Sequence, residues 1–336
     1  MKRRLFAVLL GLFTIFALAG CIQKSKEDVV ADLNAKVEKM TGYQAAAKLS
    51  IKTGTEPQVY DVDIWHNKPN YYRVNLKNAK KDQSQIILRN DEGVFVLTPA
   101  LNKSFRFQSN WPQNSSQAYL YESLVRDILK DKTAVFKNTD KHYVFETKTN
   151  YQNQNMVPKQ EITFSKKDLS PVSVKLMDND QNVIVQVNFS KVKFDTKFDK
   201  GAFEVKRNMS SAQMEIPAAA KEDKPFSVLY PNDTPQGMTL KEEKELQAKN
   251  GKRVILTYGG DKKTFTLIQE KAKVAQTSTT IGVSGEPVDL GFTVGALAKD
   301  SVTWSHNGVD YTLAAKGLTQ EELLMVARSV YEKASK

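Results

Sequence analysis

Cysteine and histidine are scarce in this sequence. The 336 residues include one cysteine, Cys21, and three histidines, His66, His142 and His306. A single thiol cannot form an internal disulfide, and the three histidines lie in separate segments without the short spacing typical of metal ligands. The sequence therefore predicts neither a disulfide framework nor a metal site, and we expect no cofactor.

Familiar catalytic motifs are absent as well. The sequence contains no Gly-Lys-Ser phosphate loop, no Gly-x-Ser-x-Gly nucleophile turn and no His-Glu-x-x-His metal helix. The sequence alone does not exclude a pair of catalytic carboxylates, because any two of the 38 acidic residues could meet in the folded chain. We predict that the protein is not an enzyme.

The longest apolar run lies near the N-terminus and is too short to span a bilayer. It covers residues 5–19 (LFAVLLGLFTIFALA), whereas a membrane-spanning helix needs about 20 apolar residues. Lys2, Arg3 and Arg4 precede the run, and Ala19-Gly20-Cys21 follows it. A basic start, an apolar middle and a small-residue cleavage site predict a secretory signal peptide at residues 1–20.

Cys21 stands where that signal peptide would be cut. The tetrapeptide Leu18-Ala19-Gly20-Cys21 resembles the lipobox of bacterial lipoproteins, in which a diacylglycerol is joined to the cysteine before cleavage. The resemblance implies a mature chain that begins at Cys21 and is anchored at the extracytoplasmic face of the cell membrane. Two acyl chains hold a protein stably on a bilayer. The alternative is a soluble secreted protein in which Cys21 has no such role.

Basic residues outnumber acidic ones. The formal net charge is +11, and it falls to +8 once Lys2, Arg3 and Arg4 leave with the signal peptide. The remaining basic residues are spread along the chain without a cluster that alternates with aromatic residues. We therefore predict no nucleic-acid partner, and the charge suits an anionic membrane or cell-wall polymer.

A change in composition predicts two domains. Residues 210–225 (SSAQMEIPAAAKEDKP) are small, polar and proline-containing, which is typical of a linker. We place the first domain at residues 21–217 and the second at residues 218–336.

The first domain reads as strands with two helices. Residues 25–41 have a helical pattern with a capping box at Ser25 and Asp28, and residues 116–131 form a second helical stretch. Strand patterns occupy residues 59–65, 71–77, 85–99 (two strands around the turn at 91–93), 103–109, 142–148, 160–166, 171–178 and 182–194. Residues 178–182 read as a hairpin turn, because Val183 and Phe189 stand where a calcium loop needs glycine and an acid.

A sheet with apolar residues on one face must be covered there, by helices, by a ligand or by both. The segment IWHNKPNYYRV places Trp65, Lys68, Pro69 and Arg73 around the join of two strands. This pattern resembles the lipoprotein-carrier family of LolA, LolB and RseB, which implies a curved antiparallel half-barrel sheet covered by helices around a hydrophobic cavity. Lys68 departs from the arginine of the carriers, and lysine cannot make the same bidentate contacts.

The whole chain, with its predicted anchor, looks most like the YdcC- and GerS-like sporulation lipoproteins of spore-forming Gram-positive bacteria. Such cells have no outer membrane to receive lipoproteins. The resemblance therefore implies a tethered binding or scaffold role in the sporulation or germination envelope, and not a shuttle.

The second domain is predicted to be a small α+β unit. Residues 253–270 and 302–317 read as hairpins around Gly259-Gly260 and Asn307-Gly308. Thr319 and Glu322 form a capping box before a C-terminal helix. The end of the chain resembles a small domain of extracytoplasmic lipoproteins and anti-sigma-linked proteins, and we expect Trp304 and Tyr311 in its core.

Two functions remain open at this point. In the first, the sheet and the helix at 116–131 enclose a cavity for an acyl chain, lined by Tyr60, Val62, Ile64, Tyr72, Val74, Leu76, Phe105, Phe107, Leu120, Leu124 and Ile128. In the second, the same residues form a filled core, and the protein is an RseB-like scaffold or regulatory lipoprotein that binds a membrane protein and no lipid. An apolar cavity of several hundred cubic ångströms would favour the first.

Overall fold

The computed structural model describes residues 23–53, 56–78, 84–114, 116–151, 156–199, 201–214, 227–248, 251–260 and 262–331. The predicted signal peptide, Cys21 and the predicted domain boundary at 217/218 lie outside these residues. None of the described helices is long and apolar enough to cross a membrane.

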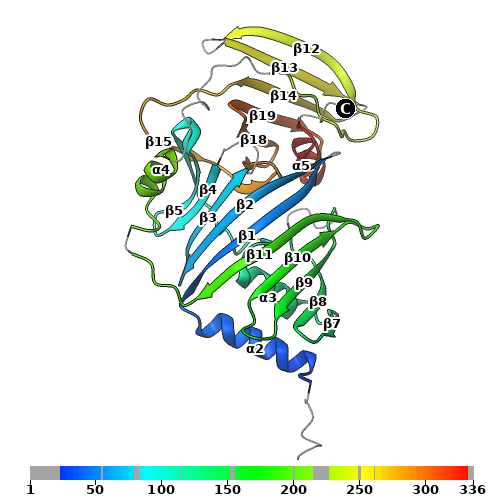
Figure 1. The fold of residues 1–336 in the computed structure, drawn as a ribbon. Helices are drawn as coiled ribbons and strands as arrows, with labels where there is room; N and C mark the ends of the chain where they lie inside the picture. Colours follow the sequence, from blue (N-terminus) through cyan, green and yellow to red (C-terminus); the bar gives the residue numbers. More distant parts are fainter. Residues whose placement is uncertain are drawn as a thin grey trace, which may run out of the picture.

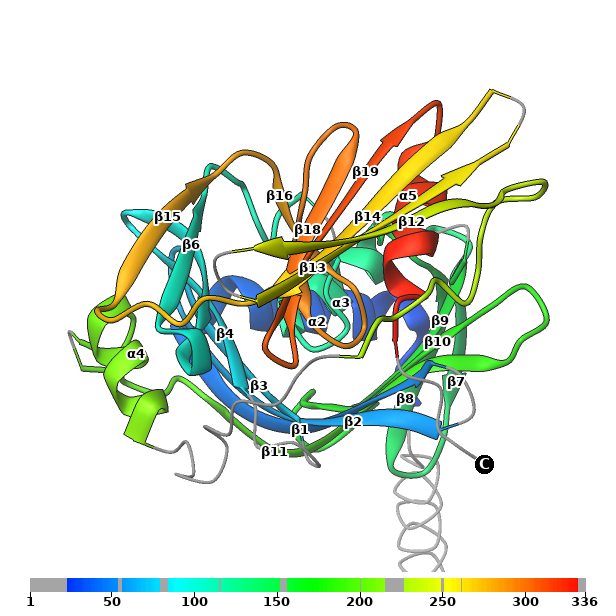
Figure 2. The same cartoon turned by 90° about the horizontal axis from the view of Figure 1, so that it is seen from above.

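Two sheets make up most of the molecule (Figure 1). The larger has twelve strands in the order β15-β6-β5-β4-β3-β2-β1-β11-β10-β9-β8-β7. Its bounds are β1 (Gly42–Thr53), β2 (Glu56–Asn67), β3 (Tyr71–Asn78), β4 (Ser84–Asn90), β5 (Gly93–Thr98), β6 (Lys103–Phe107), β7 (Val135–Asn138), β8 (His142–Lys148), β9 (Lys159–Ser165), β10 (Pro171–Met177), β11 (Val183–Phe194) and β15 (Thr279–Val283). A short 3-10 helix, η1 (Pro99–Leu101), joins β5 to β6. The predicted meander of strands is confirmed, and the sheet curves as expected (Figure 2).

The smaller sheet has seven antiparallel strands in the order β12-β13-β14-β19-β18-β17-β16. Its bounds are β12 (Thr239–Ala248), β13 (Gly251–Gly259), β14 (Thr264–Lys271), β16 (Glu286–Asp289), β17 (Val294–Leu297), β18 (Ser301–His306) and β19 (Val309–Lys316). With helix α5 (Gln320–Arg328) it forms what we call the second unit. Asn307 and Gly308 both have positive φ, as the tight turn of the predicted hairpin requires.

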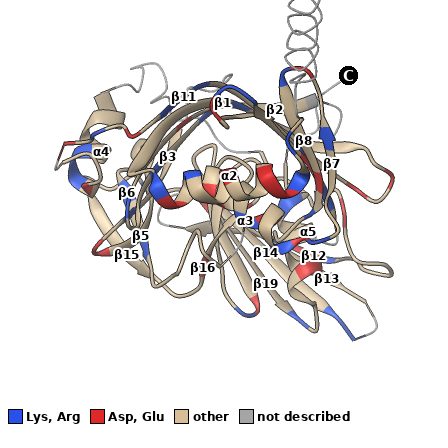
Figure 3. Cartoon of the chain, turned by 90° about the horizontal axis from the view of Figure 1, so that it is seen from below, with Lys and Arg blue, Asp and Glu red and all other residues tan. Residues whose placement is uncertain are grey.

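Helix α2 (Lys26–Lys39) closes the end of the curved sheet that faces away from the second unit (Figures 1 and 3). The predicted capping box of Ser25 and Asp28 is present, and Val29 and Leu33 are buried in the core. Lys68 donates from Nζ to the carbonyls of Val37 and Glu38 at the end of this helix, at 2.7 Å each. A cation suits the negative end of a helix, so lysine performs a holding role here.

Helix α3 (Tyr121–Lys130) is shorter than the predicted 116–131. Its N-cap is Leu120, and the residues before it are held in a loop by side chains, since Ser116 Oγ donates to Asp127 Oδ1 at 2.5 Å. Leu124 and Ile128 are buried on the concave side of the sheet. The helix therefore fills the half-barrel from within.

Helix α4 (Val205–Met214) packs against the other face of β4 and β5 and was not predicted. Ile86, Leu88, Phe95 and Leu97 contact it, whereas the intervening Ile87, Val94 and Val96 face the concave core. Both strands are thus buried on both faces, which explains their nearly continuous apolar sequence. Residues 210–214, which the sequence assigns to a linker, therefore belong to this helix.

Helices alone were predicted to cover the concave face of the large sheet. This is corrected, because the second unit also covers part of that face. The molecule is mostly β, and the second unit lies across the end of the concave face opposite α2 (Figures 1 and 2). Strand β15 leaves the second unit and pairs in parallel with β6. The large sheet is therefore mixed and not purely antiparallel.

Candidate binding cavity

A cavity of about 440 Å³ lies between the concave face of the large sheet and the second unit. Its volume falls within the range of roughly 300–1,000 Å³ that is typical of small-molecule sites. The lining residues of the first part of the chain are Leu49, Ile51, Lys52, Ile87, Trp111, Ser116, Gln117, Ala118, Tyr119, Tyr151, Met156, Val157, Leu176, Asp178, Asn179, Ile184 and Val185. The later part contributes Asp233, Pro287, Asp289, Leu290, Gly291, Val294, Met325, Arg328, Ser329 and Tyr331.

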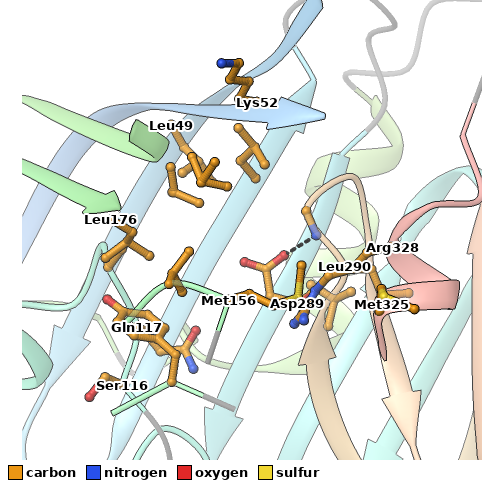
Figure 4. Close-up of a pocket in the computed structure, with 18 of the residues that line it drawn as sticks. Leu49, Lys52, Ser116, Gln117, Met156, Leu176, Asp289, Leu290, Met325 and Arg328 are labelled. Atoms are coloured by element: carbon orange, nitrogen blue, oxygen red, sulfur yellow. Dashed lines mark hydrogen bonds between the residues drawn. The ribbon is translucent and has the colours of Figure 1, made fainter. Parts of the chain in front are cut away.

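The walls are mainly apolar because alternate strand residues face inward. Ile51 on β1, Val185 on β11 and Leu176 on β10 are neighbours across paired strands, and all three line the cavity. Figure 4 shows Leu49 and Leu176 on one side of the cavity, with Leu290 and Met325 on the opposite side. Met156 lies between these walls in the same view. The arrangement can enclose an apolar group between two structural units.

Polar contacts fix the second unit over the sheet. Gln85 Oε1 accepts hydrogen bonds from Val294 N at 2.8 Å and from Thr293 Oγ1 at 3.0 Å. Lys103 Nζ pairs with Asp310 at 3.2 Å beside the β15–β6 ladder. These contacts join residues that are about two hundred positions apart in the sequence. The cavity depends on them, because each unit supplies only part of its wall.

Asp289 is the most distinctive polar side chain of the cavity. The exposed part of its side chain faces the cavity, and protein atoms surround the remainder of the side chain (Figure 4). Its Oδ1 accepts a hydrogen bond of 2.7 Å from Gly291 N, shown dashed in Figure 4. Burial raises the pKa of Asp289, against the opposing effects of this hydrogen bond and of the Arg328 charge. The cavity thus offers one acceptor oxygen to a polar group of a ligand.

Arg328 lies next to Asp289 at the end of α5. Its Nε and Nη2 donate to the backbone carbonyl of Asp289 at 3.2 and 2.8 Å. Burial lowers the pKa of Arg328 to about 10, and the Asp289 carboxylate opposes this. Its Nη1 is buried without a hydrogen-bond partner among the described residues. Holding the 289–291 turn against α5 is therefore its visible role.

None of the predicted lining residues is among those that line this cavity. Their side chains belong to, or pack against, one core cluster that includes residues of α2 and α3. Leu76 and Phe105 are partly buried and the other nine are buried: Tyr60, Val62, Ile64, Tyr72, Val74, Phe107, Leu120, Leu124 and Ile128. The sequence correctly identified apolar inward positions, but it could not distinguish packed ones from open ones.

The four motif residues are structural and lie away from the cavity. The Arg73 guanidinium lies 4.3 Å from the Trp65 ring centre, and its Nη1 pairs with Asp63 at 2.7 Å. Its Nε donates to Asn208 on α4 at 2.6 Å. Lys68, followed by Pro69, holds α2 as described above. The motif therefore ties α2 and α4 to the join of β2 and β3.

The histidines show no shared site in the described chain. His66 is buried, and its Nε2 lies 2.8 Å from Glu122 Oε1 while its Nδ1 lies 3.0 Å from the Tyr71 carbonyl. Among the described residues, no group of three His, Cys, Asp or Glu side chains could hold a metal ion.

Sequence comparison places the chain among known proteins. Residues 1–203 match the family described as "Sporulation protein YdcC-like". The sporulation protein YdcC of Bacillus subtilis (strain 168) is 54% identical over 335 residues, which cover 99% of each chain. The chain belongs to the YdcC-like sporulation protein family. The expected resemblance to this group is thereby confirmed.

Solved structures also match, at lower sequence identity. A MucA/MucB complex of Pseudomonas aeruginosa matches with a TM-score of 0.33 and 14% identity, covering 91% of this chain and 98% of that chain. A LolA superfamily protein of Nitrosomonas europaea matches with a TM-score of 0.30 and 10% identity, covering 53% and 98%. The CwlD amidase of Clostridioides difficile in complex with the GerS lipoprotein matches with a TM-score of 0.25 and 17% identity, covering 53% and 99%.

Proposed function

We propose that this YdcC-like chain is a membrane-anchored extracytoplasmic lipoprotein with a LolA-like fold that binds a hydrophobic ligand during sporulation. The observation that carries the proposal is the cavity of about 440 Å³ with mainly apolar walls. Protein interiors are otherwise packed to the density of organic crystals. A space of this size, lined by Leu49, Leu176, Leu290 and Met325, is suited to an acyl chain or a similar apolar group.

The position of the cavity supports reversible binding more than a structural role. It lies between two units that are joined by polar contacts, by one strand pair and by the packing of Val294 and Ala296 into the core of the large sheet. Ligand sites occur preferentially at such interfaces, because a small relative movement can open them. Asp289 would accept a hydrogen bond from the polar head of a ligand, while the apolar walls surround the acyl chain of that ligand.

Ligand binding can be tested by filling the cavity. Met156 lines it and is 43% exposed, so Met156→Trp should occupy the cavity without disturbing the core. We expect the purified wild-type chain to retain lipid that mass spectrometry detects after organic extraction, and the variant to retain much less. Met214→Trp is the matched control, because Met214 is 81% exposed at the end of α4 and does not line the cavity.

Two results would contradict the ligand proposal. One is a wild-type chain that retains no lipid and does not bind a fluorescent fatty acid. The other is equal retention by Met156→Trp and Met214→Trp. Either result would favour the scaffold role, in which a membrane-protein partner and not a lipid is recognised.

The anchor is tested separately through Cys21. Cells that express the wild-type chain and receive a fatty-acid analogue should incorporate the label into this protein, and Cys21→Ser should abolish incorporation. The variant should also keep its signal peptide, which the mass of the intact chain reports. Labelled Cys21→Ser protein would show that the acyl chains are attached elsewhere or that the lipobox interpretation is wrong.

A further inference from the structure

The end of the molecule that carries α2 has a groove with an excess of lysine. The groove has a volume of about 530 Å³ and lies between α2, the β9–β10 turn and the residues after β11. Its lysines are Lys24, Lys36, Lys39, Lys166 and Lys167, and its acids are Asp32, Asp168 and Asp195. We call these residues the lysine groove. They do not overlap with the lining of the binding cavity.

The three acids of the lysine groove already have partners. Asp32 pairs with Lys24, and Asp195 Oδ1 accepts hydrogen bonds from Thr41 N at 2.8 Å and Thr41 Oγ1 at 3.2 Å. Asp168 accepts from Ser170 N and Oγ at 3.1 and 2.7 Å. These acids fix the local turns and the start of α2, while the lysines outnumber them. The groove therefore presents net positive charge to solvent.

Two of the lysines are held in place by aromatic rings. Lys36 Nζ lies 4.1 Å from the Phe194 ring centre, and Lys166 Nζ lies 5.3 Å from the Tyr143 ring centre. Cation–π contact and burial of the aliphatic stems reduce the freedom of these side chains while the ammonium groups stay at the groove. Lys39 and Lys167 are exposed beside them. Part of the charge is thus ordered before any partner arrives.

The chain itself determines what faces this groove. Only Ile22 and Gln23 separate the predicted anchor Cys21 from Lys24, and three residue steps span at most about 10 Å. If the proposed anchor is correct, the lipid head groups lie about one Debye length from the lysine groove, so surface charge is felt there. Figure 1 shows α2 at the end of the molecule opposite the second unit. Anchoring at Cys21 therefore turns this end toward the bilayer.

We infer that the lysine groove is a docking surface for anionic lipid head groups, which sets the orientation of the anchored protein on the membrane. The inference rests on the proposed anchor for its geometry and adds a second, electrostatic contact. With α2 against the bilayer, the second unit and the binding cavity stand away from it. The chemistry recognised is the phosphate of phospholipids such as phosphatidylglycerol, which lysine binds as a point charge.

The test uses a chain that begins at residue 22, which lacks the anchor and keeps every described residue. We expect it to co-sediment with vesicles of phosphatidylcholine and phosphatidylglycerol, less so as salt is added, and not with phosphatidylcholine alone. Lys166→Gln/Lys167→Gln should lower the affinity roughly twenty-fivefold, because each lysine near an anionic surface contributes about fivefold. Lys299→Gln/Lys316→Gln, two exposed lysines of the second unit, changes the net charge equally and should have little effect.

Three outcomes would overturn the inference: no binding to anionic vesicles, equal binding to neutral vesicles, or equal losses for the two double variants. Circular dichroism and thermal melts of both variants exclude loss of folding as the cause. Because this chain carries no lipid, the result does not depend on acylation. Fatty-acid labelling of Cys21 decides the anchor, so a failed anchor and a failed groove give different results.

Discussion

Asp289 and Arg328 place two ionisable groups at the wall of a mainly apolar cavity. Each lies in an environment that disfavours its charge, since burial raises the pKa of the carboxyl and lowers that of the guanidinium. Hydrogen bonds still hold both side chains in place. Gly291 N donates to the Asp289 carboxylate, and the Arg328 guanidinium donates to the Asp289 backbone carbonyl. A polar ligand group that donates to Asp289 would offset part of the cost of this burial.

Stability should depend on pH through Asp289. A carboxyl with a raised folded-state pKa holds its proton more tightly when folded, so stability decreases as pH rises from the usual carboxyl range through the raised value. Asp289→Asn keeps an acceptor for Gly291 N and cannot ionise. We expect the variant to have a larger free energy of unfolding than the wild type at neutral pH, with the difference vanishing below about pH 4.

Denaturant titrations over a pH series measure this difference. Asp300→Asn, at an exposed turn residue of the second unit, controls for the loss of one negative charge. An Asp289→Asn variant less stable than the wild type at neutral pH would mean that attraction to Arg328 exceeds the cost of burial.

Among the secondary-structure elements, helix α3 is part of the core and does not act as a lid. Leu124 is fully buried, so Leu124→Ala should lower the free energy of unfolding by about 2–5 kcal/mol. Leu129 lies on the same helix and is 43% exposed, so Leu129→Ala should cost less than about 0.5 kcal/mol. Chemical denaturation measures both. A small effect at Leu124 together with weaker lipid retention would restore the interpretation of α3 as a movable cover.

Elements with a local signal could be predicted from the sequence. The capping boxes at Ser25 and Thr319 and the turn at Asn307-Gly308 occur as expected, because each depends on residues a few positions apart. Helix α4 lacked such a signal, since Glu204, the residue before it, is not of a type that favours the N-cap. Strand β12 was missed because both its faces are exposed, so it shows no apolar alternation.

The cavity could not be predicted for a different reason. Its walls come from strand ends, from the loops at 116–119 and 156–157, and from the turn at 289–291. Their meeting depends on contacts such as Gln85 with Val294, whose partners share no local pattern. The sequence identified the inward-facing residues of β2 and β3. Whether their side chains pack against helices or line a cavity depends on the whole fold.

The two units are interlocked at the scale of the whole molecule. Residues 279–283 of β15 pair with residues 103–107 of β6, so the large sheet includes a strand from beyond the predicted boundary. The pairing joins the second unit to the edge of the large sheet. Two independent domains on a flexible linker would not maintain such a cavity, because their relative position would vary.

Limited proteolysis provides the test of this interlocking. The sequence predicts an exposed linker between α4 and the second unit, and we expect first cleavage there. The nicked wild-type protein should nevertheless elute as one species in size-exclusion chromatography, and its two fragments should separate only in denaturant. In Thr280→Pro/Ile281→Pro the fragments should separate without denaturant, since adjacent strand amides point to opposite edges and one of the two must face β6. Wild-type fragments that separate freely after cleavage would show that β15 does not hold the units together, and that the cavity between them is not a lasting feature of the protein in solution.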